Sequence, residues 1–285
     1  AVTVKTKRPD LAKFGAEFRL TAGSFKSYSG NASLNIPIIQ DTLALRLVGG
    51  YEYSDGFMRN GACYGPVQTF LTTPPALPAT TAKFVGRSGC GDGRRVGGTD
   101  VYNLRAKLLW EPSDNFDALL QYEMIRDSSE TPATVNETPV NGGGRFFLFD
   151  ALNVGSRGNK SSDPLNNGGV SNRQDGLMRM QDGHVVNVDG VYLNMNVDVG
   201  MGTFTSITGW RSQRSRLPST YTGQAPVAAD GSVLSLFDAT RDDDRKTWQQ
   251  EVRFASDLGG AFDFVAGGFH QRDNADFCVN QLLGF

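Results

Sequence analysis

Segments in which apolar and polar residues alternate recur along this chain, and they constrain its fold more than any other feature. In FGAEFRLTAGSF (14–25), Phe14 and Phe18 fall on one face and Glu17 on the other. Because successive side chains of a β-strand point to opposite faces, this alternation predicts a strand with one apolar and one polar face. Eight further segments alternate in the same way: 28–36, 42–53, 100–112, 116–125, 184–199, 203–214, 246–256 and 262–272.

The connections between these segments alternate between short turns and long loops. Turns such as PSDN (112–115) and GMG (200–202) join some neighbours, whereas polar stretches rich in Gly and Pro cover about 54–99, 126–183 and 215–244. Short turns require antiparallel neighbours, so all the short turns are expected at one end of the sheet and all the long loops at the other. This asymmetry is typical of a transmembrane β-barrel, whereas a soluble β-sandwich has shorter strands and no such alternation of loop lengths.

The aromatic residues and the number of strands also favour a barrel. Transmembrane barrels carry aromatic girdles near their strand ends, where we expect Tyr51, Tyr53, Trp110, Phe116, Trp210 and Phe262. Counting from Phe14 gives nine strands, but bacterial single-chain barrels have even numbers, since an unpaired edge is not tolerated in a bilayer. We therefore expect the chain to cover about the first half of a larger barrel.

Composition excludes several other classes of function. The chain has 28 Lys and Arg against 30 Asp and Glu, so it carries no general positive field that would attract nucleic acid. Two histidines and the absence of a GxSxG motif leave no credible catalytic triad. We expect no enzyme, no cofactor and no metal site.

Three stretches resemble one family, the TonB-dependent outer-membrane receptors. AVTVKTKRPD (1–10) resembles the last plug strand of these receptors and its TKRP junction with the barrel. NIPIIQDTLALRLVGGYEYSDGF (35–57) is similar to their second and third barrel strands. SLFDATRDDDRKTWQQEVRFAS (235–256) and the strand after it look like the branch common in sphingomonads.

The resemblance implies a fold, an activity and partners. It implies a barrel of 22 antiparallel strands with long extracellular loops and short periplasmic turns, in the outer membrane of a Gram-negative bacterium. Residues 1–10 would be the end of the plug domain and the junction, and 11–285 the N-terminal part of the barrel. The implied activity is import of a scarce ligand such as a ferric siderophore. The implied partners are the TonB complex, reached through an N-terminal region that this sequence lacks, outer-membrane lipid, lipopolysaccharide and the ligand.

Cysteines and loop residues supply the candidate sites. Cys63 and Cys90 lie in the first long loop and are expected to form a disulfide in an oxidising exterior, although two free thiols are the alternative. Cys278 is left without an expected partner. Arg94 and Arg95 could contact an anionic ligand or lipopolysaccharide.

Further candidates come from an apolar stretch and from charged residues. In the second long loop, Phe146, Phe147 and Phe149 could line a constriction or contact the ligand, although packing of the loop on itself explains them equally well. RDDDRK (241–246) suggests Ca²⁺ ligands, but a solvated charge run is the preferred interpretation. His184 and His270 are expected to be structural or surface residues.

Three other functions remain open. A passive porin or a structural outer-membrane protein would share the architecture, and a plug upstream of residue 1 distinguishes the transporter from both. A soluble carbohydrate-binding β-protein would be extracted without detergent.

Overall fold

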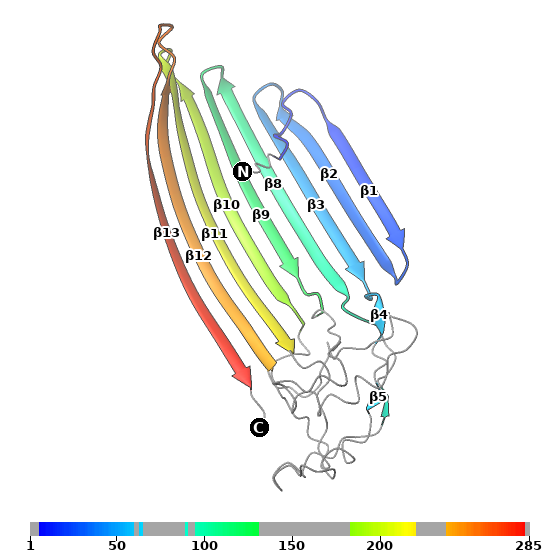
Figure 1. Ribbon diagram of the computed structural model, residues 1–285. Helices are drawn as coiled ribbons and strands as arrows, with labels where there is room; N and C mark the ends of the chain where they lie inside the picture. The colour runs from blue at the N-terminus through cyan, green and yellow to red at the C-terminus, as the bar shows by residue number, and fades with distance from the viewer. Residues whose placement is uncertain are drawn as a thin grey trace.

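Nine antiparallel strands form one open sheet in which the spatial order follows the chain order (Figure 1). The computed structural model describes residues 6–59, 63–64, 89–90, 95–130, 183–220 and 238–282. The nine strands expected from the alternation are confirmed. They are β1 (Gly15–Gly23), β2 (Ser27–Ile39), β3 (Leu43–Ser54), β8 (Thr99–Ser113), β9 (Phe116–Asp127), β10 (Val185–Asp198), β11 (Gly202–Thr220), β12 (Asp238–Ser256) and β13 (Val265–Leu282).

Two short antiparallel pairs lie within the first long connection. β4 (Met58–Arg59) pairs with β7 (Arg95–Val96), and β5 (Cys63–Tyr64) pairs with β6 (Gly89–Cys90). The residues that the structure describes include no helix long and apolar enough to cross a membrane.

The two ends of the sheet differ as the sequence predicts, with one exception. The turns after β2, β8, β10 and β12 gather at one end, here called the turn end, and the long connections after β3, β9 and β11 leave from the other, the loop end (Figure 1). The expected strict alternation is wrong for β1 and β2. Their connection, 24–26, lies at the loop end yet is a tight turn in which Ser27 N–H donates to the Ser24 carbonyl at 3.1 Å.

The last three strands extend further than the alternation predicts. β11 continues to Thr220 and β12 begins at Asp238, so much of the expected loop 215–244 is paired strand, and RDDDRK lies inside β12. Cross-strand ion pairs explain the extension, since Arg214 meets Asp244 at 3.1 Å and Arg216 meets Asp242 at 3.7 Å.

Strand geometry also argues against the Ca²⁺ interpretation of RDDDRK. Because successive residues of β12 point to opposite faces, Asp243 points away from Asp242 and Asp244. No group of three or more potential metal ligands occurs among the described residues.

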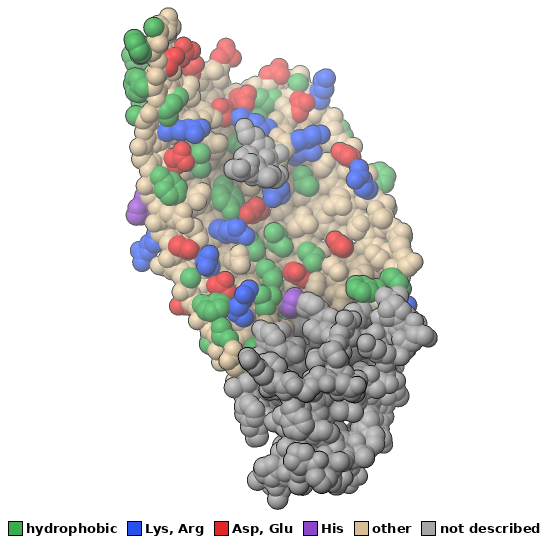
Figure 2. Space-filling model, in the orientation of Figure 1, with side chains coloured by type: hydrophobic (Ala, Val, Ile, Leu, Met, Phe, Trp, Pro, Cys, Tyr) green, Lys and Arg blue, Asp and Glu red, His purple; other side chains and the backbone are tan. Residues whose placement is uncertain are grey.

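The sheet has an apolar face and a polar face. Alternation along each strand and the observed register place Leu45 beside Leu108 on the apolar face, and Arg46 beside Lys107 on the polar face. Figure 2 shows Lys and Arg side chains spread among Asp and Glu across the face that carries the N-terminal segment.

A single layer leaves many large apolar side chains uncovered. Among the described residues, only Ala44, Leu109, Val188, Ala239 and two prolines are buried apolar residues, whereas Phe18 is 78% exposed, Phe269 61% and Trp110 47%. A soluble protein rarely presents apolar area of this extent to water. The apolar face is therefore suited to contact with an apolar environment rather than with water.

Two aromatic belts bound the apolar face. At the turn end, Trp110 meets Phe116 with ring centroids 5.5 Å apart, and Phe204 meets Phe254 at 4.6 Å. At the loop end, Tyr28 stacks on Tyr53 at 5.0 Å. Belts at two heights are what a bilayer-spanning sheet places at the two membrane surfaces.

Two aromatic residues differ from their expected positions. Trp210, opposite Trp248 in the register, lies in the middle of β11 rather than near its end, because β11 continues to Thr220. Phe262 lies in the connection between β12 and β13, which belongs to the turn end, rather than within a strand.

Polar side chains between the belts satisfy one another. The Thr208 hydroxyl donates to Gln250 Oε1 at 2.6 Å, and Gln250 Nε2 donates to the Ser206 hydroxyl at 3.0 Å. An unpaired polar group in an apolar environment costs several kcal/mol. Mutual bonding lets these three residues lie within the apolar band.

Candidate functional site

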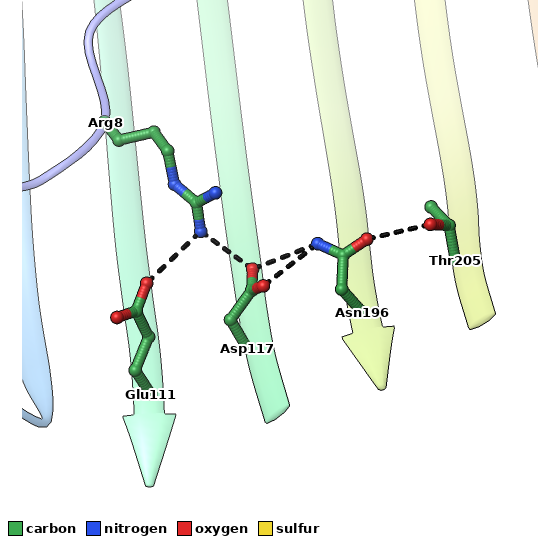
Figure 3. Close-up of polar contacts among 5 residues, drawn as sticks. All are labelled: Arg8, Glu111, Asp117, Asn196 and Thr205. Carbon is green, nitrogen blue, oxygen red and sulfur yellow. Dashed lines mark hydrogen bonds and ion pairs between the residues drawn. The ribbon is translucent and has the colours of Figure 1, made fainter. Parts of the chain in front are cut away.

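An extended segment, residues 6–13, crosses the polar face in front of β8 near the turn end (Figures 1 and 3). We call this segment the strap. Pro9 is its buried residue. Ala44 and Leu109, which are opposite each other in the register, are also buried, at 0% and 3% exposure, on a wall that is otherwise largely open.

Lys107 on β8 is the central anchor of the strap. Its ammonium donates to the Thr6 hydroxyl at 2.5 Å, the Thr6 carbonyl at 3.2 Å and the Lys7 carbonyl at 3.1 Å. Lys107 is 5% exposed, and these three bonds use all the donors that an ammonium has. A buried lysine without such acceptors would be strongly destabilising, so Lys107 and the strap depend on each other.

Arg8 begins a chain of polar contacts that runs across four strands (Figure 3). Its Nη2 donates to Asp117 Oδ2 at 2.7 Å and to Glu111 Oε1 at 3.4 Å. Asn196 Nδ2 donates to both carboxylate oxygens of Asp117, and the Thr205 hydroxyl donates to Asn196 Oδ1 at 2.9 Å. The strap is thereby linked through side chains to β8, β9, β10 and β11.

Asn35 on β2 fixes the other end of the strap. Asn35 Oδ1 accepts from Asp10 N–H at 2.9 Å, while its Nδ2 donates to the Asp10 carbonyl at 2.9 Å and the Lys13 carbonyl at 2.7 Å. Asp10 Oδ1 accepts from the N–H groups of Ala12 and Lys13, which closes a turn just before β1. Asn35 is 3% exposed, so these bonds replace water completely.

The anchors differ in strength. Arg8, Glu111 and Asp117 are 49%, 37% and 24% exposed, and ion pairs this accessible contribute about 1 kcal/mol or less. Lys107 and Asn35 are buried, so loss of their bonds leaves unsatisfied polar groups and costs more. The strap thus has two firm anchors, Lys107 and Asn35, and one accessible cation, Arg8, whose two ion pairs can exchange.

The ion pair borders an acidic pocket. A pocket of about 510 Å³ at the turn end is lined by Glu111, Asp117, Asp41, Asp114 and Asp198, among others. Within the described residues, Arg8 is the only cation that pairs with this lining.

A second polar cluster lies on the same face. Tyr192 donates to Glu123 Oε1 at 2.9 Å, and Arg105 contacts Glu123 Oε2 at 3.4 Å. The Tyr192 ring lies against Gly190 and Gly209, where an added Cβ would come within 2.9 and 3.1 Å of it. Both glycines allow this close approach.

The loop end is held by a strained turn. Phe25 and Lys26 have φ values of 63° and 51°, which are unfavourable without glycine. Asp55 N–H donates to the Phe25 carbonyl at 3.0 Å, and Lys26 Nζ pairs with Asp55 at 2.9 Å. The hydrogen bond from Lys26 holds the pKa of Asp55 below its usual value.

Arg95 is the one predicted ligand contact that the structure describes. Its guanidinium lies 4.3 Å from the Phe25 ring centroid and donates to the Phe57 carbonyl at 3.3 Å. It borders a loop-end pocket of about 340 Å³ that also contains the carboxylates of Asp55, Asp100 and Glu130. Arg95 therefore helps to hold the strained turn, and a role in ligand contact stays a prediction.

Most of the other predicted site residues lie outside the described residues. These are Arg94, Phe146, Phe147 and Phe149. Cys63 and Cys90 are direct register partners in β5 and β6, and Cys278 is an exposed free thiol. Direct register partners have closely spaced backbones, which suits a disulfide.

We expect one reactive thiol in this chain rather than three. Alkylation of the denatured, non-reduced full-length protein followed by peptide mass spectrometry should label Cys278 and leave Cys63 and Cys90 unlabelled until a reductant is added. Labelling of Cys63 and Cys90 before reduction would contradict the predicted disulfide.

His184 is predicted to make stability depend on pH. It precedes β10, its N–H donates to the Ser129 carbonyl at 2.7 Å, and burial lowers its pKa below 6.5, partly opposed by Asp127. His184 therefore binds a proton more readily in the unfolded chain than in the folded one. Its contribution to the free energy of unfolding is fully present above pH 6.5 and is lost as the pH falls through the folded pKa. Urea unfolding of the detergent-solubilised protein at a series of pH values should show this loss, and H184Q should reduce it. An equal loss in H184Q would assign the effect to other groups.

Sequence reasoning missed the residues that hold the strap. Lys107, Asn35 and Glu111 lie within the expected strands 28–36 and 100–112, but their partners are distant in the chain and the alternation does not reveal them. The only available signal was the TKRP resemblance itself, since Thr6, Lys7 and Arg8 all bind the wall and Pro9 is buried.

Comparisons with known proteins address the fold. No protein-family model and no curated protein match this chain. Among solved structures, the ferric yersiniabactin uptake receptor FyuA from Yersinia pestis matches with a TM-score of 0.56 at 16% identity, over 98% of this chain and 33% of that chain. The chain thus spans about a third of the length of that receptor, and the likeness is one of fold.

Two other siderophore receptors match less well. PirA from Acinetobacter baumannii has a TM-score of 0.41 at 14% identity, over 89% of this chain and 32% of that chain. A mutant of the ferric enterobactin receptor PfeA from Pseudomonas aeruginosa has a TM-score of 0.41 at 10% identity, over 95% and 38%. Of these three structures, FyuA is the one whose TM-score supports a likeness of fold.

Proposed function

We propose that this chain is part of a TonB-dependent outer-membrane transporter that imports a small scarce ligand such as a ferric siderophore. In this proposal residues 1–10 end a plug domain, 11–285 begin a barrel of 22 strands, and the loop end faces the exterior. The apolar face contacts lipid and the polar face lines the lumen. The fold likeness to FyuA, an uptake receptor for a ferric siderophore, supports the proposal.

The strap is the observation that carries this proposal. A passive porin keeps a water-filled lumen, whereas the interior of other barrels is occupied by further parts of the chain. Here the segment before β1 lies on the polar face and is held by buried Lys107 and Asn35. This arrangement suits a barrel whose interior is occupied by the chain that precedes it.

The exposure of the strap ion pair suits a transporter in another respect. A plug must stay attached to the barrel while its interior contacts rearrange. Lys107 and Asn35 supply permanent attachment at the junction, and the Arg8 pairs with Glu111 and Asp117 are accessible enough to exchange. Ligand capture by the loops and movement of the plug, driven from the periplasm by TonB, complete the proposed mechanism without any catalytic step.

Energised uptake tests this proposal. The full-length protein is expressed in a Gram-negative host without siderophore receptors, with and without TonB, and uptake of a panel of radiolabelled ferric siderophores is measured under iron limitation. We expect uptake of at least one ligand only in the TonB-containing host, with surface binding retained in both.

The alternative functions give different results. Equal uptake with and without TonB would identify a passive porin. Full-length protein that remains soluble without detergent would favour the soluble carbohydrate-binding protein and overturn the proposal.

A further inference from the structure

The turn between β1 and β2 places two residues in an unfavourable backbone conformation. Ser27 N–H donates to the Ser24 carbonyl, which makes Phe25 and Lys26 the two central residues of the turn. Both have positive φ, as a type I′ turn requires, but such turns strongly prefer Asn and Gly at these positions. A residue with a Cβ pays free energy for this conformation, so the Phe-Lys sequence disfavours the turn that it forms.

Three contacts to these two residues come from one place, residues 55–57 and 95–98, which we call the loop base. Asp55 N–H donates to the Phe25 carbonyl at 3.0 Å, and the Asp55 carboxylate pairs with Lys26 Nζ at 2.9 Å. The Arg95 guanidinium lies 4.3 Å from the Phe25 ring centroid. Each contact falls on a residue with unfavourable φ, and strained residues persist where surrounding structure holds them.

The loop base has contacts of its own that position Asp55 and Arg95. Arg95 donates to the Phe57 carbonyl at 3.3 Å, and β4 pairs with β7 just beyond. Gly98 is buried, and an added Cβ there would lie 2.5 Å from the Ser54 carbonyl oxygen and 3.3 Å from the Asp55 carbonyl carbon. The two halves of the loop base are therefore packed backbone to backbone.

The β1–β2 hairpin is attached to other segments at both of its ends. At the turn end, Asn35 on β2 bonds to the Asp10 and Lys13 carbonyls of the strap. At the loop end, the loop base contacts the turn. Among the described strands, β1 pairs only with β2. The contacts with the loop base therefore determine whether the loop end of this hairpin is fixed.

We infer that Phe25, Lys26, Asp55 and Arg95 form a conformational latch between the β1–β2 hairpin and the first long connection. We call these four residues the turn latch. Asp55 and Arg95 hold the turn in its strained conformation, and the turn relaxes when their contacts are lost. The hairpin that follows the strap thus has a release point within the first long connection. This inference goes beyond the proposed function and requires neither a ligand nor TonB.

Hydrogen exchange of the full-length protein in detergent, read by mass spectrometry with single-residue fragmentation, tests the turn latch. The amide of Ser27 reports the turn, and the amide of residue 55 reports its contact with the loop base. In R95Q we expect both amides to exchange roughly fivefold faster, because the cation–π contact with Phe25 is lost. In D55A we expect a similar acceleration at Ser27, because the pair with Lys26 is lost.

K26G distinguishes a strained latch from a simple ion pair. It removes the same Lys26–Asp55 pair as D55A, but glycine adopts positive φ without a steric penalty. Exchange at Ser27 in K26G should therefore stay within about twofold of the wild type. Equal acceleration in K26G and D55A would overturn the inference, since the ion pair alone would then hold the turn.

E52A is the matched control for the loss of a carboxylate near the loop end of β3. Its register partners are Ser29 and Val101, which lie outside the turn. Exchange at Ser27 that is unchanged in E52A and faster in D55A and R95Q supports the turn latch. Equal acceleration in E52A would assign the effect to a general change of charge and overturn the inference. Unchanged exchange at Ser27 in both D55A and R95Q would also overturn it, because the turn would then hold itself.

Discussion

Replacing Lys107 with Met is expected to release the strap from the wall. The substitution removes the donor shared by the Thr6 hydroxyl and the carbonyls of Thr6 and Lys7, but it keeps a side chain of similar length. Loss of these charge-assisted bonds should lower the free energy of unfolding by roughly 3 kcal/mol. It should also let trypsin cleave after Lys7 and Lys13 in the folded full-length protein, which limited proteolysis with N-terminal sequencing can measure.

Arg8 provides the control for this prediction. R8Q removes the ion pairs with Glu111 and Asp117, which are partly exposed, and should cost about 1 kcal/mol or less. Trypsin cleavage of R8Q should stay close to that of the wild type. If K107M and R8Q are cleaved equally fast, the strap is not held chiefly by Lys107.

Replacing Gly202 with Ala is expected to disrupt the turn between β10 and β11. Gly202 has a φ of 151°, and an added Cβ would lie 2.4 Å from the Ala255 carbonyl oxygen and 2.8 Å from the Ser256 Cα. These are backbone atoms of β12, so relief requires the strands to separate at the start of β11. We expect a loss of about 3 kcal/mol or more, measured by urea unfolding in detergent.

Gly200, in the same turn, is the control that distinguishes the cost of backbone strain from the cost of a steric collision. Its φ is 81°, but an added Cβ would meet nothing within 4 Å. G200A should therefore cost about 1 kcal/mol, the usual penalty for a left-handed conformation without glycine. Equal effects of G200A and G202A would mean that contact with β12 contributes nothing.

Alternation predicts the strands well because burial of a face is a local property of each segment. Leu45 and Arg46 are assigned to opposite faces from the sequence alone, and the register confirms it. The predicted strand boundaries are less accurate where cross-strand ion pairs determine how far a strand extends. Arg216 and Asp242 lie in the loop expected from the sequence, yet their cross-strand ion pair belongs to a continuous ladder between β11 and β12.

The candidate site could not be predicted in the same way. Lys107 and Arg105 are both basic, on the same strand and the same face, but only Lys107 meets the strap. The difference comes from a contact between residues about a hundred positions apart in the sequence, which no local pattern encodes. Loop-end candidates such as Arg95 can be found from the sequence, because Gly-rich and polar composition indicates a loop. The residues that they contact cannot be found in this way.

The sequence by itself determined nine strands, their antiparallel pairing and the division into an apolar and a polar face, because side-chain alternation and turn length act on neighbouring residues. Only the tertiary structure decided that TKRP lies on the polar face and that Lys107 and Asn35 hold it there. Those features depend on which distant groups meet, and hydrogen bonds and ion pairs are specific only once the backbone has brought their partners within reach.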